Sequence, residues 1–488
     1  MDDFGRTFGT LDSTVQGLLV SIILIPAAIV SFGSGSIADR LSRTHAICLG
    51  CAIYGLGSLV CSLCGLYSQS QKSALVMLFF GRCICGAGEG VFLSAVTIYT
   101  IEVSPVHARG RMGCIVQLFI CIGIMAGYFV CYGSINIQGS FSWRLPWVLQ
   151  CFTCASLAMA VRFIPHSPRW LMLAGRRDAA HAAMRRLGID EDVLFGIIEE
   201  KLNNEQGREK SMGGWRQSIK QFKEAFAPEL RGRTILALFM LGVQQLAGID
   251  GLLYYAPVLF KQAGLSTENA TFLASGITGI VNVVFTIVGQ TLSDKWGRVP
   301  SIMIGGVFMA LAMTIIGILY SLPSLNRSGQ YAVIAFIYVY VIAFIMSWAI
   351  LMRVWVSESQ PLRTRATVSS LALTLNWGVN FVIAFTTPVF LGHAPSGPYF
   401  LWGAATWFAI GIFWVWMPET KGTSIDREGQ DLSLKARVPW ARLQRGKDKN
   451  KPEIKRPPYS RRGTSWTLAG DEVENKDDTV ARLDEEVL

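Results

Sequence analysis

Apolar blocks of up to about twenty residues recur along this chain, for example over 20–30, 47–63, 114–131 and 302–319. An α-helix rises about 1.5 Å per residue, so about 20 apolar residues cross the ~30 Å hydrocarbon core of a bilayer. Only 16% of the 488 residues are charged, whereas soluble domains carry about 25%. The pattern predicts a polytopic helical membrane protein. It excludes a soluble globule, a disordered chain and a secreted disulfide scaffold.

The connections between the apolar blocks alternate in charge. One set is rich in Arg and Lys, and the opposite set carries only an occasional cation. The positive-inside rule therefore places the basic set in the cytoplasm. Eleven spans are expected, at about 14–37, 45–66, 74–97, 112–134, 145–163, 235–259, 270–293, 300–321, 331–356, 366–390 and 399–417.

These spans divide the chain into four parts. Residues 1–163 are expected to form a bundle of five spans, and residues 235–418 a bundle of six. The segment 164–234 between them alternates apolar and charged residues at helical spacing, which favours amphipathic helices on the cytoplasmic surface. The polar, proline-containing tail 419–488 is expected to be largely disordered and cytoplasmic. Two sequons in the outside connections make Asn269 and Asn326 candidate glycosylation sites.

The charge and cysteine patterns bear on partners. The net charge of +10 lies in connections and tail, so it indicates membrane orientation and no nucleic-acid partner. None of the eleven cysteines follows Cys154, and nearly all lie in apolar blocks without a nearby histidine. We therefore interpret them as small packing residues and expect no metal or cofactor. The sequence shows no nucleophile–base pair and no phosphate-binding loop, so we expect that the protein is not an enzyme.

Two short signatures occur twice in the chain. They lie 63 residues apart in the first copy and 64 in the second, and both copies fall in cytoplasmic connections. This predicts two halves with the same orientation, as in transporters built from parallel repeats. The copies are Asp39-Arg40-Leu-Ser-Arg43 with Asp294-Lys295-Trp-Gly-Arg298, and Glu102-x-x-Pro105-x-x-x-Arg109 with Glu358-x-x-Pro361-x-x-x-Arg365.

The two copies differ in what precedes them. Two spans lie ahead of Asp294 in the second half, but only one lies ahead of Asp39. We therefore expect that the first half lacks its opening helix. Truncation of the given sequence is the favoured explanation, and a natural eleven-span protein is the alternative.

With these motifs in place, the chain resembles the sugar porter family of the major facilitator superfamily over nearly all of 11–426, and its fungal members most. The resemblance implies two pseudo-symmetric helix bundles that transport a sugar by alternating access. Besides the repeated signatures, it rests on Arg82 before Gly86-x-Gly88-x-Gly90, Tyr99, Gln117, Trp143-Arg144, Pro165-x-Ser167-Pro168-Arg169-Trp170, Gln244-Gln245-x-x-Gly248-x-Asp250 before Tyr254-Tyr255, Asn282, Asn376-x-x-x-Asn380-Phe381 and Pro418-Glu419-Thr420-Lys421-Gly422.

Six amides lie inside the expected spans. Membrane helices rarely carry polar amides unless these face a cavity or a partner helix. An amide offers both donors and acceptors, which suits a ligand covered in hydroxyls, and the resemblance assigns these positions to sugar binding. Interhelical hydrogen bonding alone is the alternative. The candidate substrate-binding amides are Gln117, Gln244, Gln245, Asn282, Asn376 and Asn380.

Charged residues at the cytoplasmic helix ends form a candidate gate network. Paired between helix ends, they would latch the inner gate shut, since even weak pairs bias two conformations of similar free energy. Solvated loop charge is the alternative. Ser42 and His166 replace a family glycine and acid, which predicts a weaker latch in the first half. The gate candidates are Asp39, Arg40, Arg43, Glu102, Arg109, Asp294, Arg298, Glu358, Arg365 and Glu419.

Four departures from the family pattern lie near the expected site. Asp250 replaces a sugar-binding asparagine, Arg353 replaces an aromatic residue, and Glu89 adds a carboxyl. Because buried charges are costly in a membrane, Asp250 and Arg353 are expected to face the cavity or each other. Their pairing suggests specificity for a sugar acid, polyol or cyclic acid, and a purely structural pair is the alternative. Ala349-Ile350 replaces Gly-Pro, which predicts a less broken helix.

Coupling to protons rests on fewer residues. Family symporters pair an acid on the first helix with the arginine matching Arg82, and that helix is absent here. Glu89 and Asp250 are the alternative titratable groups. The sequence thus predicts a monomeric plasma-membrane carrier for a small sugar-like solute, with proton symport or facilitated diffusion left open. A non-transporting nutrient sensor is the rival function.

Overall fold

The computed structural model describes residues 2–66, 70–104, 109–188, 220, 222–228, 230–265, 267–322, 326–418, 459–462 and 465–468. The chain separates into two compact units, Met1–Arg437 and Val438–Leu488. Among the described residues, eleven helices are long and apolar enough to cross a membrane. The eleven predicted spans are therefore confirmed, with ends that differ by a few residues.

The first half contributes five of these spans. The first is interrupted after α2 (Ser13–Ser21) and resumes as α3 (Leu24–Leu41). A short helix that the sequence did not predict, α1 (Asp2–Phe8), packs Phe8 on Trp143 with ring centroids 5.1 Å apart. The remaining spans are α4 (Arg43–Leu63), α5 (Gln71–Glu102), α6 (Arg109–Ser134) and α7 (Phe141–Ala160), which continues as η2 (Val161–Phe163).

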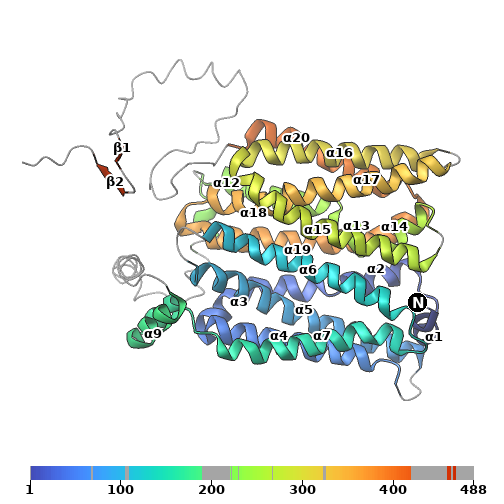
Figure 1. Cartoon of the computed structure of the whole chain (residues 1–488), viewed down its shortest axis with the longest axis horizontal. Coiled ribbons are helices and arrows are strands. Elements are labelled where there is room, and N and C mark those ends of the chain that lie inside the picture. The colour runs from blue at the N-terminus through green and yellow to red at the C-terminus, as the bar shows by residue number, and fades with distance from the viewer. Residues whose placement is uncertain are drawn as a thin grey trace, which may run out of the picture. The chain divides into compact units, whose positions relative to one another are not determined.

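The second half contributes six spans, and its helices lie above those of the first half in Figure 1. The first of them is built from three pieces, α12 (Arg231–Leu246), α13 (Ile249–Tyr254) and α14 (Ala256–Gln262). The others are α15 (Glu268–Trp296), α16 (Arg298–Ser321), α17 (Arg327–Met346) with α18 (Trp348–Ser359), α19 (Leu362–His393) and α20 (Gly397–Trp416).

The repeat seen in the sequence has a matching backbone geometry. Ser42, between α3 and α4, has φ 88° and ψ 155°, and Gly297, between α15 and α16, has φ 94° and ψ 166°. Only glycine adopts this region without strain, and another residue there costs about 1–3 kcal/mol. Ser42 therefore carries a strained turn that its counterpart makes freely.

Helices α4 and α5 touch through their backbones. A Cβ on Gly50 would lie 2.6 Å from the backbone nitrogen of Phe92, and one on Gly57 would lie 2.6 Å from that of Cys85. Gly81 and Gly88 face these two positions from α5. Small residues allow such close approach, which is how membrane helices associate without a hydrophobic driving force.

The two halves meet along α2 and α3 against α19, and along α6 against α15. We call the end of the bundle that carries Ser42 and Gly297 the inner end, because the positive-inside rule places it in the cytoplasm. At the outer end, a Cβ on Gly17 would overlap the carbonyl oxygen of Phe385. Nearer the inner end of the same span, a Cβ on Gly33 would have no atom within 4 Å. The halves are therefore in close backbone contact at the outer end, and the inner part of the first span has room for a side chain at Gly33.

The linker and tail are described only in part. In the linker, α8 (Pro168–Leu173) and α9 (Arg177–Leu187) bury Leu171, Met172, Ala180, Ala183 and Met184 against one another. In the tail, β1 (Tyr459–Arg462) pairs antiparallel with β2 (Ser465–Leu468). The sequence did not predict this hairpin in the segment expected to be largely disordered.

Candidate functional site

Two interrupted helices position the central polar residues. Gly248 has φ +90° and separates α12 from α13, which carries Asp250. The helix that was expected to be less broken around Trp348 is interrupted just before it, since α17 ends at Met346 and Ser347 takes φ −127° and ψ −73°. Gln244 Nε2 donates to the Trp348 carbonyl at 2.6 Å, which stabilises this break from a neighbouring span.

Gln244 and Asn376 serve mainly to join helices. Asn376 Nδ2 donates to the Leu241 carbonyl at 2.8 Å and to Gln244 Oε1 at 3.2 Å. Gln245 Nε2 donates to Asn376 Oδ1 at 3.2 Å. All three amides are buried. These bonds tie α12 to α19. The observed geometry of Gln244 therefore fits the alternative that this amide only forms hydrogen bonds between helices.

Asp250 and Asn380 form the polar contact nearest to the break in α12. Asn380 Nδ2 donates to Asp250 Oδ2 at 2.6 Å and approaches the Tyr254 hydroxyl at 3.3 Å. Asn376 and Asn380 lie one turn apart on α19, so one helix face presents both amides. Tyr254 is 42% exposed, and its position four residues after Asp250 is the signal that places it on the same face of α13.

Several buried amide atoms of the candidate substrate-binding residues have no hydrogen-bond partner in the described part of the chain. They are Gln245 Oε1, Asn380 Oδ1 and both polar atoms of Asn282. Leaving a buried polar atom unpaired costs about 1–3 kcal/mol. A ligand or a water molecule that paired with these atoms would remove this cost.

Charged side chains from both halves lie near the same region. Arg82 on α5 donates to the Val20 carbonyl at 2.7 Å. Glu89, two turns further along α5, feels the charges of Arg82 and Asp250. Arg353 on α18 likewise feels the charge of Asp250, although no direct ion pair joins them among the described residues. The charges of Asp250 and Arg353 thus interact without a direct ion pair in the described structure, and whether both face a substrate cavity stays a prediction.

Gln117 lies apart from these contacts. Its Nε2 donates to the Cys121 sulfur of the same helix at 3.8 Å. Cys121 in turn lies 3.3 Å from the Thr286 hydroxyl of α15, across the contact between the halves. The sequence did not predict this contact or the hydrogen bond from Tyr128 to the Leu253 carbonyl at 2.5 Å.

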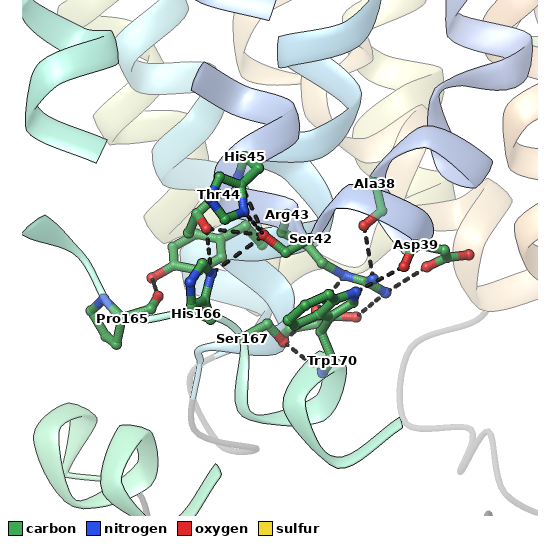
Figure 2. A network of polar contacts seen from close by, with 12 residues as sticks. Ala38, Asp39, Ser42, Arg43, Thr44, His45, Pro165, His166, Ser167 and Trp170 are labelled. Carbon is green, nitrogen blue, oxygen red and sulfur yellow. Dashed lines mark hydrogen bonds and ion pairs between the residues drawn. The ribbon is translucent and has the colours of Figure 1, made fainter. Parts of the chain in front are cut away.

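The inner end of the first half carries the polar network shown in Figure 2. Arg43 contacts Glu102 through Nε at 2.9 Å and Nη2 at 3.1 Å, and both side chains are 6% exposed. Asp39 also contacts Arg43, at 2.8 Å. Ser167 donates to Glu102 at 2.5 Å, and Trp170 Nε1 donates to the Asp39 carbonyl at 2.8 Å. The linker is thereby attached to this ion pair.

The substitutions at Ser42 and His166 do not prevent this pairing. Ser42 Oγ lies 2.9 Å from His45 Nδ1, and Thr44 Oγ1 lies 2.6 Å from His166 Nδ1. Burial, followed by the charges of His45 and Arg176, lowers the pKa of His166 below 6.5. The first half therefore has a bidentate, buried ion pair, and the geometry does not bear out the predicted weakening.

In the second half, Arg298 contacts Glu358 at 3.1 Å. Arg365 donates to the Gln360 carbonyl, and Arg40 is exposed. The described pairs, Arg43 with Glu102 and Arg298 with Glu358, join helix ends within each half, and their role as a latch stays a prediction. The side chains of Arg109 and Asp294, and all of Glu419, lie outside the described residues.

The candidate glycosylation sites lie at the outer end. Asn326 is exposed and caps α17, since its Oδ1 accepts from the Gly329 amide at 2.8 Å. Asn269 lies in the first turn of α15, and its side chain is outside the described residues.

Similar folds occur among solved structures. The proton:xylose symporter XylE of the major facilitator superfamily, bound to 6-bromo-6-deoxy-D-glucose, superposes with a TM-score of 0.72 at 24% identity, over 87% of this chain and 92% of that chain. The inward-open xylose transporter XylE from E. coli gives 0.71 at 22% identity, over 87% and 92%. The protein therefore has the major facilitator fold, as predicted.

Sequence comparison leads to the family. The profile of the family described as "Sugar (and other) transporter" matches residues 5–431. A high-affinity glucose transporter of Kluyveromyces lactis is 30% identical over 449 residues, which cover 88% of this chain and 79% of that protein. Polyol transporter 5 of Arabidopsis thaliana is 29% identical over 439 residues, covering 84% and 77%. The chain belongs to this family of sugar transporters, and it is a multi-pass membrane protein.

Proposed function

We propose that this protein carries a small polyhydroxylated solute across the plasma membrane by alternating access, as a monomer and without catalytic chemistry. The observation that carries the proposal is the set of buried amide atoms on Gln245, Asn282 and Asn380 that have no hydrogen-bond partner among the residues described. A solute hydroxyl both donates and accepts, so it pairs with the oxygen and the nitrogen of an amide alike. A ligand of this kind removes the cost that the unpaired atoms impose.

The contacts between the halves support the transport mechanism. Gly17 touches the backbone of α19 at the outer end, whereas Gly33 and Gly35 have open space nearer the inner end. Rocking of one half against the other about a central site would close the inner end and open the outer one. The inner ion pairs Arg43–Glu102 and Arg298–Glu358 would then exchange partners between halves.

Proton coupling is part of the proposal. Glu89 from the first half and Asp250 from the second each lie near an arginine of their own half, Arg82 and Arg353. Because the carboxyls interact with each other across the halves, a proton on either one changes the electrostatic cost of bringing the halves together. Substrate uptake into proteoliposomes with an imposed pH gradient tests this, and uptake independent of the gradient indicates facilitated diffusion.

Asn282 provides a direct test of the site. Asn282→Ala removes a fully buried amide that has no described partner, so solute affinity should fall about tenfold while the protein is no less stable. Counterflow in proteoliposomes measures transport, and scintillation proximity measures binding. Asn326→Gln, at the outer end, is the control. Unchanged affinity of Asn282→Ala contradicts the site, and binding without counterflow favours the nutrient sensor.

A further inference from the structure

Arg353 stands out among the residues of its helix. Its side chain is exposed, whereas its neighbours Met352 and Trp355 are fully buried. The charge of Asp250, on α13, acts on it. Asp250 in turn is bonded to Asn380 on α19, which carries one of the unpaired amide atoms. Arg353 is therefore an exposed cation close enough to Asp250 for the two charges to interact.

The guanidinium of Arg353 makes no hydrogen bond or direct ion pair among the described residues. Asp250, the carboxylate whose charge it feels, instead accepts from Asn380 Nδ2 at 2.6 Å. The five N–H donors of an arginine form a planar fork that matches a carboxylate in bidentate geometry. The donors of Arg353 are thus unused within the described part of the chain.

We propose that Arg353 binds the carboxylate of the transported solute, which is a polyhydroxylated acid such as a sugar acid or a cyclic polyhydroxy acid. The inference rests on the proposed carrier function and names its substrate class. The unpaired atoms of Gln245, Asn282 and Asn380 pair with the hydroxyls of the solute. Asp250 repels a carboxylate from the Asn380 side, so the two charged residues together orient the acid group towards α18.

A purely structural ion pair between Asp250 and Arg353 is the competing explanation. A buried ion pair requires direct contact, because only close geometry gives an attraction large enough to offset the desolvation of the two charges. The structure shows Asp250 bonded to an amide and Arg353 exposed. These observations favour a ligand-binding role for the arginine.

Matched solutes test the substrate class. D-glucuronate and D-glucose differ only in the carboxylate at C6, and quinate and myo-inositol provide a cyclic acid and a neutral cyclic polyol. Counterflow and competition in proteoliposomes should show that the wild type prefers D-glucuronate or quinate to the neutral partner by about tenfold or more. Preference for the neutral solutes overturns the inference but leaves the carrier function intact. Movement of none of the four, with intact folding, contradicts both.

Variants of Arg353 distinguish binding of the solute carboxylate from a structural ion pair with Asp250. Arg353→Gln should lower the ratio of acid to neutral affinity by about ten- to a hundredfold, and Arg353→Lys should restore part of it. Arg327→Gln, an exposed arginine at the outer end of α17, is the matched control. If Asp250→Asn combined with Arg353→Gln restores acid affinity, the arginine serves only to neutralise Asp250, and the inference is wrong.

Discussion

The closeness of α2 and α19 at the outer end depends on the missing side chain of Gly17. A Cβ at this position would overlap the Phe385 carbonyl oxygen and lie 3.1 Å from Cγ of Pro388. The obstacle is backbone, so no rotamer change relieves it, and the helices must separate. We therefore predict that Gly17→Leu disfavours the conformation described here, which is closed at the outer end.

The size of the expected change in conformational population follows from the distances around Gly17. Real Cβ atoms essentially never approach another heavy atom within 3.0 Å, and overpacking a tight contact costs about 1–3 kcal/mol. Such a cost lowers the population of the outer-closed state by about 5- to 150-fold. Leucine adds further atoms beyond Cβ, so the upper part of this range is expected.

Accessibility at Gly33 provides the assay. A Cβ there has no atom within 4 Å, so a cysteine at position 33 should react with maleimide while the inner end is open. Labelling of this residue, followed by peptide mass spectrometry, should be slower in Gly17→Leu/Gly33→Cys than in Gly33→Cys alone. Counterflow should fall while solute binding from outside persists. Equal labelling rates with undiminished transport would refute the reasoning.

Three further predictions follow from the described contacts. Gly248→Ala places a Cβ in the left-handed region and against the buried Trp402 ring, so about 2–5 kcal/mol of stability and most solute binding should be lost. The control Gly378→Ala, with open space around the new Cβ, should match the wild type in a thermal-unfolding assay. Glu102→Gln removes the buried ion partner of Arg43 and leaves only the exposed Asp39, so it should cost about 3 kcal/mol. This is more than the cost expected for Glu358→Gln, whose side chain is 19% exposed, and equal shifts in melting temperature would contradict it. The pKa of His166 is lowered in the folded protein, so protonation of this side chain disfavours the folded state. The stability present above pH 6.5 should therefore decline as the pH falls through the lowered pKa. His166→Gln should flatten this pH dependence and His393→Gln should not, as measured by hydrogen exchange over 165–173.

The sequence predicted the parts of the fold that depend on local pattern. The eleven spans follow from the length of apolar runs, and the shared face of Asn376 and Asn380 follows from helical spacing. The break at Gly248 was also predictable, because glycine tolerates a positive φ that other residues resist. Each of these features is determined by residues close together in the chain.

The features that the sequence did not predict depend on distant contacts. The interruption at Ser347 has no glycine or proline to mark it, and it is stabilised by Gln244 from another span. The partner of Glu102 was equally open, because charge patterns identify helix ends but not which arginine meets which acid. Gln244 satisfies its donor on a backbone carbonyl, and nothing in its spacing distinguishes it from an amide that is free for a solute.

The backbone contact between α4 and α5 has a consequence for how the protein adapts to its cargo. No layer of side chains separates these helices at Gly50 and Gly57, so they cannot slide or tilt past each other and should behave as one stiff block. Glu89 follows Gly88 directly, within this block. Fitting solutes of different shape therefore falls to the opposite wall, where the segmented spans around Gly248 and Ser347 can flex.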